Sequence, residues 1–231
     1  MRIEVSIAVV IPIGPHKSDQ TWLEECIASV YNQTLLPDEL IIIDDMADPG
    51  WIQLFNKYNH PNTKLVYYDN PWLLGVAASF NIGISFANSD LMFMLGSDDK
   101  LLPTCLEQVV KTYKKHNDLL GYYYVEVVYD NGERQSLACN AAAVTRKLWE
   151  HTGGFSPETS VGAPDAAFIS TLLAHKGAAG NLYLVDGGVQ YFVRRHKNQD
   201  TVKRKSYQKE IVSVRNIVTA NWKIPKWGRV L

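Results

Sequence analysis

Residues 91–103, LMFMLGSDDKLLP, are the stretch that decides the fold of this chain. A run of apolar residues leads directly into two adjacent carboxylates, Asp98 and Asp99. A strand that is apolar on both faces is typical of the centre of a parallel sheet covered by helices on both sides. Such sheets bind ligands beyond the carboxyl ends of their strands, so the pattern predicts a functional position for the two acids.

A second pair of acids follows another apolar strand. Residues 40–43, LIII, precede Asp44 and Asp45. One acidic pair alone is also consistent with a solvated turn that caps a helix beginning near Pro103. Two strands that each end in carboxylates favour a ligand site over two unrelated turns.

The composition fits one α/β domain with a single core. The chain has 231 residues, of which 46% are hydrophobic, and this is ample for one buried core. It contains no apolar run of about 18 residues that could form a membrane-spanning helix. We expect the opening apolar run to be the first strand and not a signal peptide. The three cysteines are far apart and in no metal-ligand spacing, which predicts free thiols in a reducing compartment: Cys26, Cys105 and Cys139.

The net charge of −1 conceals a strong asymmetry. From Arg194 onward there are 11 lysines and arginines against 2 acidic residues, a balance of +9. The residues before Arg194 carry 12 against 22, a balance of −10. This pattern predicts either a tail that meets an anion, such as nucleic acid, anionic lipid or a phosphate-rich ligand, or a tail that lies on the acidic body.

Hydrophobic periodicity predicts alternating strands and helices in the first half of the chain and an antiparallel part after Gly121. A parallel sheet with a nucleotide-binding arrangement is the expected result. We expect strands at residues 7–11, 40–43, 64–68, 91–95, 122–129, 183–185 and 190–193, and helices at residues 19–31, 76–86, 146–151, 164–175 and 203–221.

Taken in order, five motifs resemble the family 2 inverting glycosyltransferases of the GT-A fold over residues 5–200: VVIPIGPHK, LPDELIIIDDMADPG, GVAASFNIGISFANSDLMFMLGSDDKLLP, GGFSPETSVGAPDAAFISTLLAHKG and YFVRRHKNQD. The resemblance implies a Rossmann-like nucleotide-binding half with a mixed, mostly parallel sheet, and a smaller antiparallel acceptor-side part. One GT-A domain would then occupy residues 1–200, with a donor half at 1–100 and an acceptor half at 101–200. A basic amphipathic helix or tail would follow at residues 201–231.

The family transfers a hexose or a related sugar from a nucleotide-diphosphate donor, a UDP-sugar in most members, to an acceptor hydroxyl with inversion. The resemblance therefore implies an enzyme of glycan or polysaccharide biosynthesis. It also implies a donor-nucleotide site made of Pro12, Ile13, Asp44, Asp45, Asp98, Arg194 and Arg195.

The same resemblance implies a divalent metal, Mn²⁺ or Mg²⁺, held by Asp98, Asp99 and His196. Hard oxygen ligands suit these ions, and the ion would neutralise the departing diphosphate. Asp165 matches the catalytic base, which takes the acceptor proton. From the residues alone, Asp165 is equally a first-turn acid behind Pro164. His196 alone is also consistent with a solvated basic segment.

Two positions depart from the family pattern. Gly96 stands where the family commonly has the first acid of its metal motif, and Phe80 stands where an arginine often precedes Asn81. An alternative reading is therefore a degenerate protein that binds a nucleotide sugar without turnover. The acid at position 165 favours the enzyme.

The acceptor is open at this stage. Within residues 203–231, apolar side chains follow one helical stripe and basic side chains lie elsewhere. Such a helix suits an anionic membrane with a lipid-linked acceptor, a polyanion such as DNA or teichoic acid, or packing against the core. We expect a cytoplasmic enzyme that contacts the inner face of the membrane. The sequence says nothing about the oligomeric state.

Overall fold

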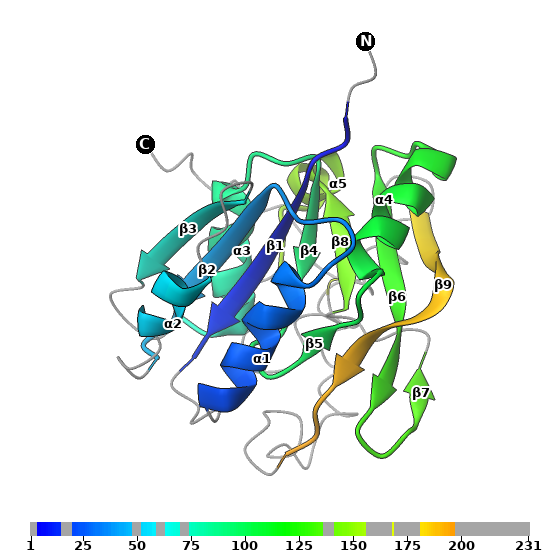
Figure 1. Ribbon diagram of the computed structural model, residues 1–231. Coiled ribbons are helices and arrows are strands. Elements are labelled where there is room, and N and C mark those ends of the chain that lie inside the picture. Colours follow the sequence, from blue (N-terminus) through cyan, green and yellow to red (C-terminus); the bar gives the residue numbers. More distant parts are fainter. Residues whose placement is uncertain are drawn as a thin grey trace, which may run out of the picture.

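The computed structural model describes residues 4–14, 20–47, 52–58, 63–69, 74–135, 141–155, 168 and 181–196. Within them, one mixed sheet of nine strands has the order β3-β2-β1-β4-β8-β6-β9-β5, and β7 pairs with β6 (Figure 1). The strands are β1 (Ile7–Ile13), β2 (Glu39–Asp44), β3 (Lys64–Asp69), β4 (Leu91–Met94), β5 (Lys100–Leu101), β6 (Gly121–Tyr129), β7 (Arg134–Gln135), β8 (Ala142–Thr145) and β9 (Asn181–Val193).

The helices cover both faces of this sheet (Figure 1). They are α1 (Gln20–Tyr31), α2 (Ile52–Lys57), α3 (Val76–Phe86), α4 (Cys105–His116) and α5 (Arg146–Thr152). Side chains of α1 and α4 pack into the core on one face, and those of α3 and α5 pack into the core on the other. The described part of the chain is thus a three-layer α/β/α arrangement.

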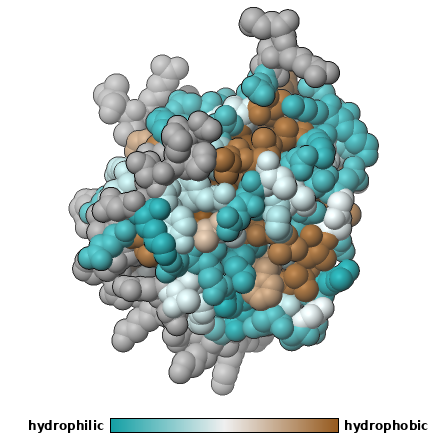
Figure 2. All heavy atoms as spheres, in the orientation of Figure 1, coloured by the Kyte–Doolittle hydropathy of each residue, from teal (hydrophilic) through white to brown (hydrophobic). Residues whose placement is uncertain are grey.

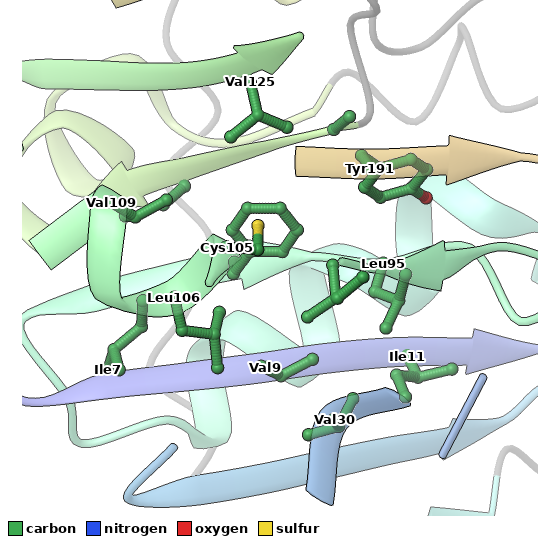
Figure 3. Packing of buried hydrophobic residues seen from close by; sticks show 14 of the residues in the cluster. Ile7, Val9, Ile11, Val30, Leu95, Cys105, Leu106, Val109, Val125 and Tyr191 are labelled. Carbon is green, nitrogen blue, oxygen red and sulfur yellow. The ribbon is translucent and has the colours of Figure 1, made fainter. Parts of the chain in front are cut away.

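The first four parallel strands follow directly from the apolar pattern. Strand β1 pairs in parallel with both β2 and β4, and β2 pairs in parallel with β3. Every residue of β1 is buried. Ile7, Val9 and Ile11 face the α1 side, where they pack with residues of α4 (Figure 3), whereas Ala8 and Val10 face α3. Burial of one large aliphatic side chain contributes about 1.5–3 kcal/mol, which makes this strand the centre of the core.

The predicted hairpin turn at residues 130–132 joins β6 and β7, which pair antiparallel, and β8 adds antiparallel pairs with β4 and β6. Strand β9 differs from the prediction. We expected two short strands, but residues 181–193 form one strand that pairs in parallel with β6 and carries register shifts. Gly187 (φ 104°) and Gly188 (φ 73°) lie in this irregular part. Beyond it, β9 continues to an antiparallel pair with β5. Glycine adopts such positive φ values without strain, which permits the bulge.

Other predictions lie partly or wholly outside the described residues. These are the C-terminal tail with its helix at residues 203–221, the helix at residues 164–175 apart from Phe168, and Cys139. Cys26 and Cys105 are buried free thiols. No described helix is long and apolar enough to cross a bilayer. On the face that carries α1, exposed hydrophobic residues lie in separate groups among hydrophilic residues (Figure 2).

Candidate functional site

The acidic pairs predicted from the sequence lie at the carboxyl ends of neighbouring strands. Asp44 is the last residue of β2 and pairs with Ile13 of β1. Asp98 and Asp99 lie in the turn between β4 and β5. Because β4 and β2 flank β1 on its two sides, the acids follow the same edge of the sheet. The prediction that both acidic pairs follow the carboxyl ends of neighbouring strands is therefore confirmed, and the ligand role of this edge stays a prediction.

The turn that carries Asp98 and Asp99 is closely packed around Gly96. The Gly96 N–H donates a hydrogen bond to the Tyr191 hydroxyl, at 3.1 Å between N and O. A Cβ atom at Gly96 would lie 2.9 Å from Asp99 Oδ2 and 3.1 Å from Asp98 Oδ1. A side chain at this position would therefore require the carboxylates of Asp99 and Asp98 to move from the places they occupy in this turn.

Asp99 is turned into the protein. Its Oδ2 accepts a hydrogen bond from the Tyr191 hydroxyl at 2.8 Å, and its Oδ1 accepts one from the Arg194 N–H at 2.9 Å. Only 2% of the residue is exposed. Burial, together with the neighbouring Asp98 carboxylate, raises the pKa of Asp99 well above its usual range. Figure 3 labels Tyr191 on β9 among the buried residues of the core, and its ring stacks on Phe93 with centroids 6.3 Å apart.

Asp98 is directed differently and meets His196. Asp98 Oδ2 and His196 Nε2 are 2.8 Å apart, and the side chains are 24% and 11% exposed. The other ring nitrogen, His196 Nδ1, is buried and has no hydrogen-bond partner among the described residues. The ring of Trp22 in α1 packs against the imidazole, with centroids 4.6 Å apart. The structure thus brings together two of the three predicted metal ligands.

Arg194 holds the end of β9 against α1. Its Nη2 lies 2.7 Å from Glu25 Oε2, its Nε donates to the Asp98 carbonyl oxygen at 3.1 Å, and its guanidinium lies over the Trp22 ring. Hydrogen bonds from Lys100 and Arg194 lower the pKa of Glu25. The guanidinium predicted to bind the donor nucleotide therefore has partners within the protein.

Arg195 is held by the hairpin formed by β6 and β7. Its guanidinium lies 4.1 Å from the centroid of the Tyr129 ring and 2.9 Å from Glu133 Oε2. Its backbone N–H donates to Asp130 Oδ2 at 3.3 Å. These contacts position the chain just before His196. They also pair the Arg195 guanidinium, which was predicted to contact a phosphate, with groups of the protein.

The first acidic pair is hydrogen-bonded to nearby backbone. Asp44 Oδ1 accepts from the Ala47 N–H at 2.7 Å, and Oδ2 accepts from the Tyr67 hydroxyl at 2.9 Å. Asp45 accepts from the N–H groups of residues 74 and 75, at 2.7 and 2.6 Å. Asp44 is 7% and Asp45 3% exposed. The two carboxylates thus hold the loops beyond β2 and before α3.

Pro12 and Ile13 end β1 beside this pair. Pro12 pairs with Ile43, and the carbonyl oxygen of Ile13 accepts a hydrogen bond from the Asp45 N–H at 2.7 Å. The main chain predicted to contact the donor base is therefore next to both carboxylates. Asp165 lies outside the described residues, so its role as catalytic base stays a prediction.

The arrangement fits a divalent cation only in part. No group of three or more histidine, cysteine or acidic residues within the described ranges could hold a metal ion. Asp98 and His196 face each other and offer one carboxylate and one imidazole. This small set fits an ion that takes its remaining ligands from water and substrate phosphates, which is how Mg²⁺ is often bound. Both carboxylate oxygens of Asp99 accept hydrogen bonds from the protein, so Asp99 is not directed toward this ion.

Three residues of this site are absent from the sequence-based prediction. Tyr191, Glu25 and Trp22 orient the predicted residues, but their sequence context is that of an apolar strand and an amphipathic helix. Trp22 and Glu25 are three positions apart, which places them on one face of the helix, and this spacing could have indicated that they act together. No comparable signal exists for the Tyr191 hydroxyl.

Comparison with curated proteins finds relatives among glycosyltransferases. Chondroitin synthase of Pasteurella multocida is 29% identical over 155 residues, which cover 58% of this chain and 16% of that protein. The abequosyltransferase RfbV of Salmonella typhimurium is 31% identical over 105 residues, which cover 43% of this chain and 30% of that protein. The matched region is therefore well under half the length of either relative.

Solved structures share the fold. TarS of S. aureus in complex with UDP has a TM-score of 0.74 at 14% identity, and the match covers 96% of this chain and 67% of that one. The mannosyltransferase PcManGT of Pyrobaculum calidifontis, in complex with GDP-Man and Mn²⁺, has a TM-score of 0.68 at 17% identity, with 95% and 65% covered. At these identities the likeness concerns the fold.

The sequence model described as glycosyl transferase family 2 matches residues 9–168. This range includes both acidic pairs and the strands that carry them. The three-layer architecture and the position of the acids agree with the expected GT-A fold. The chain therefore belongs to glycosyl transferase family 2.

Proposed function

We propose that this chain transfers a sugar from a UDP-sugar donor to an acceptor hydroxyl with inversion, in glycan or polysaccharide biosynthesis. The observation that carries the proposal is the meeting of Asp98 and His196 at 2.8 Å, at the edge of the sheet where β2 also ends in carboxylates. A carboxylate and an imidazole at this edge of the sheet would suit a cation that accompanies the diphosphate of the donor.

In this proposal the nucleoside binds where β1 and β2 end. The main chain of Pro12 and Ile13, with Asp44 and Asp45, offers acceptors for the uracil N–H and the ribose hydroxyls. Each carboxylate oxygen already accepts a hydrogen bond from the protein, which fixes its position, and the nucleoside would bind through a second lone pair of these oxygens. UDP as the nucleotide is supported by TarS, which has been solved with UDP and with UDP-GlcNAc.

Asp98 and His196 would hold a divalent cation, Mn²⁺ or Mg²⁺, and a neighbour of this fold was solved with Mn²⁺. The bound ion would stabilise the negative charge that develops on the leaving diphosphate. Asp99 would act by fixing the turn and the end of β9, since both its oxygens accept hydrogen bonds there. Arg194 and Arg195 would act by fixing the segment that carries His196.

Inversion requires one base that removes the acceptor proton while the oxygen attacks the anomeric carbon from the side opposite the diphosphate. We assign this role to Asp165. The acceptor would be a glycan, a lipid-linked saccharide or a polyanion, reached in the cytoplasm at the inner face of the membrane. The basic tail at residues 201–231 would provide the contact with the anionic surface.

Calorimetric titration with UDP and GDP, each with Mn²⁺ or with EDTA, tests the donor site without an acceptor. We expect UDP binding that weakens at least about tenfold in EDTA, in line with the loss of a metal-mediated contact. Asp98→Asn should remove the difference between Mn²⁺ and EDTA. The matched control is Asp186→Asn, an exposed acid paired with Lys115 away from the site.

Turnover is tested separately, by following UDP release from a panel of UDP-sugars with and without candidate acceptors. Tight UDP binding with no sugar transfer from any donor would favour the degenerate binding protein. No binding of either nucleotide would contradict the proposed donor site itself.

A further inference from the structure

Met46, which follows the acidic pair at the end of β2, has an unusual backbone conformation. Its φ angle is 62°. Among the described residues, the only other non-glycine residue with a positive φ is Asn117, and asparagine adopts this conformation more readily than methionine does. Asn117 ends α4, where a left-handed residue is ordinary. A left-handed methionine in a loop is uncommon, and strained residues of this kind cluster at ligand-binding positions.

Hydrogen bonds on both sides of Met46 impose this conformation. The Asp45 N–H donates to the carbonyl oxygen of Ile13 at 2.7 Å. The Ala47 N–H donates to Asp44 Oδ1, also at 2.7 Å. The chain bends at residue 46 between these two fixed points, and a glycine would do so without strain. Because a glycine would keep both backbone bonds, the fold itself does not call for a methionine at this position.

Met46 is also the most exposed large hydrophobic residue in the part of the chain that the structure describes, at 52%. A second exposed apolar residue, Tyr67, lies next to the same carboxylate. It is 38% exposed, and its hydroxyl donates to Asp44 Oδ2 at 2.9 Å. Contact between apolar surface and water is unfavourable, so a methionine that is both strained and exposed is explained when a ligand covers it.

The ligand proposed for this edge of the sheet has an apolar surface to offer. In the proposed function the nucleoside binds at Pro12, Ile13, Asp44 and Asp45, and Met46 follows these acids directly. Every nucleobase has a π-face in addition to its hydrogen-bonding edges, and the methionine thioether packs well on such rings. We propose that Met46 packs against the uracil base of the bound donor and strengthens its binding. The inference rests on the proposed function, because that function puts the nucleoside beside the two acids.

Met46→Gly should move donor binding and stability in opposite directions. Covering the exposed half of a methionine side chain corresponds to about a 3- to 10-fold gain in affinity, so the Kd for UDP with Mn²⁺ should rise by that factor. Tm should rise by about 1–4 °C, because glycine adopts the positive φ without strain. Calorimetry measures both quantities. A purely structural role for Met46 would instead lower stability and affinity together.

Two further variants separate the side chain from the backbone. Met46→Ala keeps the strained conformation and loses the thioether, so UDP affinity should fall as in Met46→Gly while Tm does not rise. Met46→Leu keeps an apolar side chain of similar volume, and its Kd for UDP should stay within about twofold. In every variant the ratio between the Kd values in EDTA and in Mn²⁺ should be unchanged, because the change leaves Asp98 and His196 paired.

Asn117→Gly and Leu119→Ala are the matched controls. The first removes the other positive φ of a non-glycine residue among those described, and the second truncates another exposed apolar side chain, 47% exposed. Both residues precede β6, which runs in the same direction as β1 and β2, so they lie at the edge of the sheet opposite Met46. Neither control should change the Kd for UDP by more than about twofold.

NMR of protein labelled with ¹³C in its methionine methyl groups tests the contact directly, in the presence of UDP and Mg²⁺. We expect a nuclear Overhauser effect between the Met46 methyl group and the H5 or H6 proton of uracil, with Met46→Leu assigning the signal by its loss. Absence of this effect at saturating UDP would overturn the inference. An unchanged Kd for UDP in Met46→Gly, or a fall in both affinity and Tm, would also overturn it. These results leave the proposed function intact, whereas no binding of UDP to the unchanged protein would remove the proposed donor site as well.

Discussion

Replacing Tyr191 by Phe probes how the site is held together. The hydroxyl of Tyr191 bridges two groups that are distant in sequence: it donates to Asp99 Oδ2 at 2.8 Å and accepts from the Gly96 N–H at 3.1 Å. Tyr191 is fully buried and Asp99 is 2% exposed, so water cannot easily replace the missing oxygen. The ring and its packing remain in the variant, which isolates the hydroxyl.

The expected loss of stability arises because the Gly96 N–H and Asp99 Oδ2 each lose a hydrogen-bond partner. A buried donor or acceptor without its hydrogen bond costs about 1–3 kcal/mol, and more when the group is charged. Asp99 keeps its bond from the Arg194 N–H, so we expect a total loss of about 2–5 kcal/mol. For a chain of this length each 1 kcal/mol lowers Tm by about 2–4 °C, which predicts a shift of about 4–20 °C.

Urea unfolding followed by tryptophan fluorescence, together with calorimetry for Tm, measures this loss. Tyr129→Phe is the matched control, because its hydroxyl donates to Gln135 at an exposed position. The control should lose less than about 1 kcal/mol, as expected for an exposed hydrogen bond. A Tyr191→Phe variant that is no less stable than the control would refute the assignment of Tyr191 as the support of the turn at Asp98 and Asp99.

Three further predictions concern single side chains. Arg194→Met should lower the free energy of unfolding by about 0.5–1.5 kcal/mol, because it removes the hydrogen bond to the Asp98 carbonyl oxygen and an ion pair with Glu25, which is 41% exposed and also pairs with Lys100. Weaker UDP binding at unchanged stability would instead indicate direct phosphate contact. Glu39→Gln should be less stable than the unchanged protein at neutral pH, and this difference in stability should shrink as the pH falls below about 4.5. Burial raises the pKa of Glu39, but hydrogen bonds from Asn88 and Ser89 outweigh it and hold the pKa below its usual value. Protonation of Glu39 on acidification therefore removes the stabilisation that its carboxylate contributes. A pH-independent difference in Tm would contradict that sign. Asp165→Asn should reduce transfer by at least about 100-fold in a coupled UDP-release assay and spare UDP affinity, and full activity would remove it as the base.

Much of the fold could be predicted, because the pattern of apolar and polar residues along the chain indicates which residues are buried. The apolar runs at residues 7–11, 40–43 and 91–95 indicated buried parallel strands, and β1, β2 and β4 are found there. The acids after two of these strands were placed correctly at one edge of the sheet, since parallel strands all end on the same side. Strand β8 was missed, because two of its four residues, AAVT, are alanines, which are depleted in strands.

The orientation of the charged residues could not be predicted. Arg194 and Arg195 were predicted as phosphate ligands because they directly precede His196, yet Arg194 pairs with Glu25 and Arg195 with Glu133. These partners are 169 and 62 positions away, and sequence spacing carries no information on such contacts. Sequence spacing likewise shows no contact by which Asp98 could be told from Asp99 as the partner of His196.

The sequence by itself determined where the parallel strands β1 to β4 lie, which edge of the sheet carries the acids and which family the motifs resemble, because these depend on local periodicity and on residue type. Only the tertiary structure decided that Asp98 meets His196 and that Asp99 is turned inward. It does so through the bulge at Gly187 and Gly188, after which β9 pairs with β5 and ends beside the acidic turn. A charged side chain takes its direction from partners that chain folding brings together, and those partners are not neighbours in sequence.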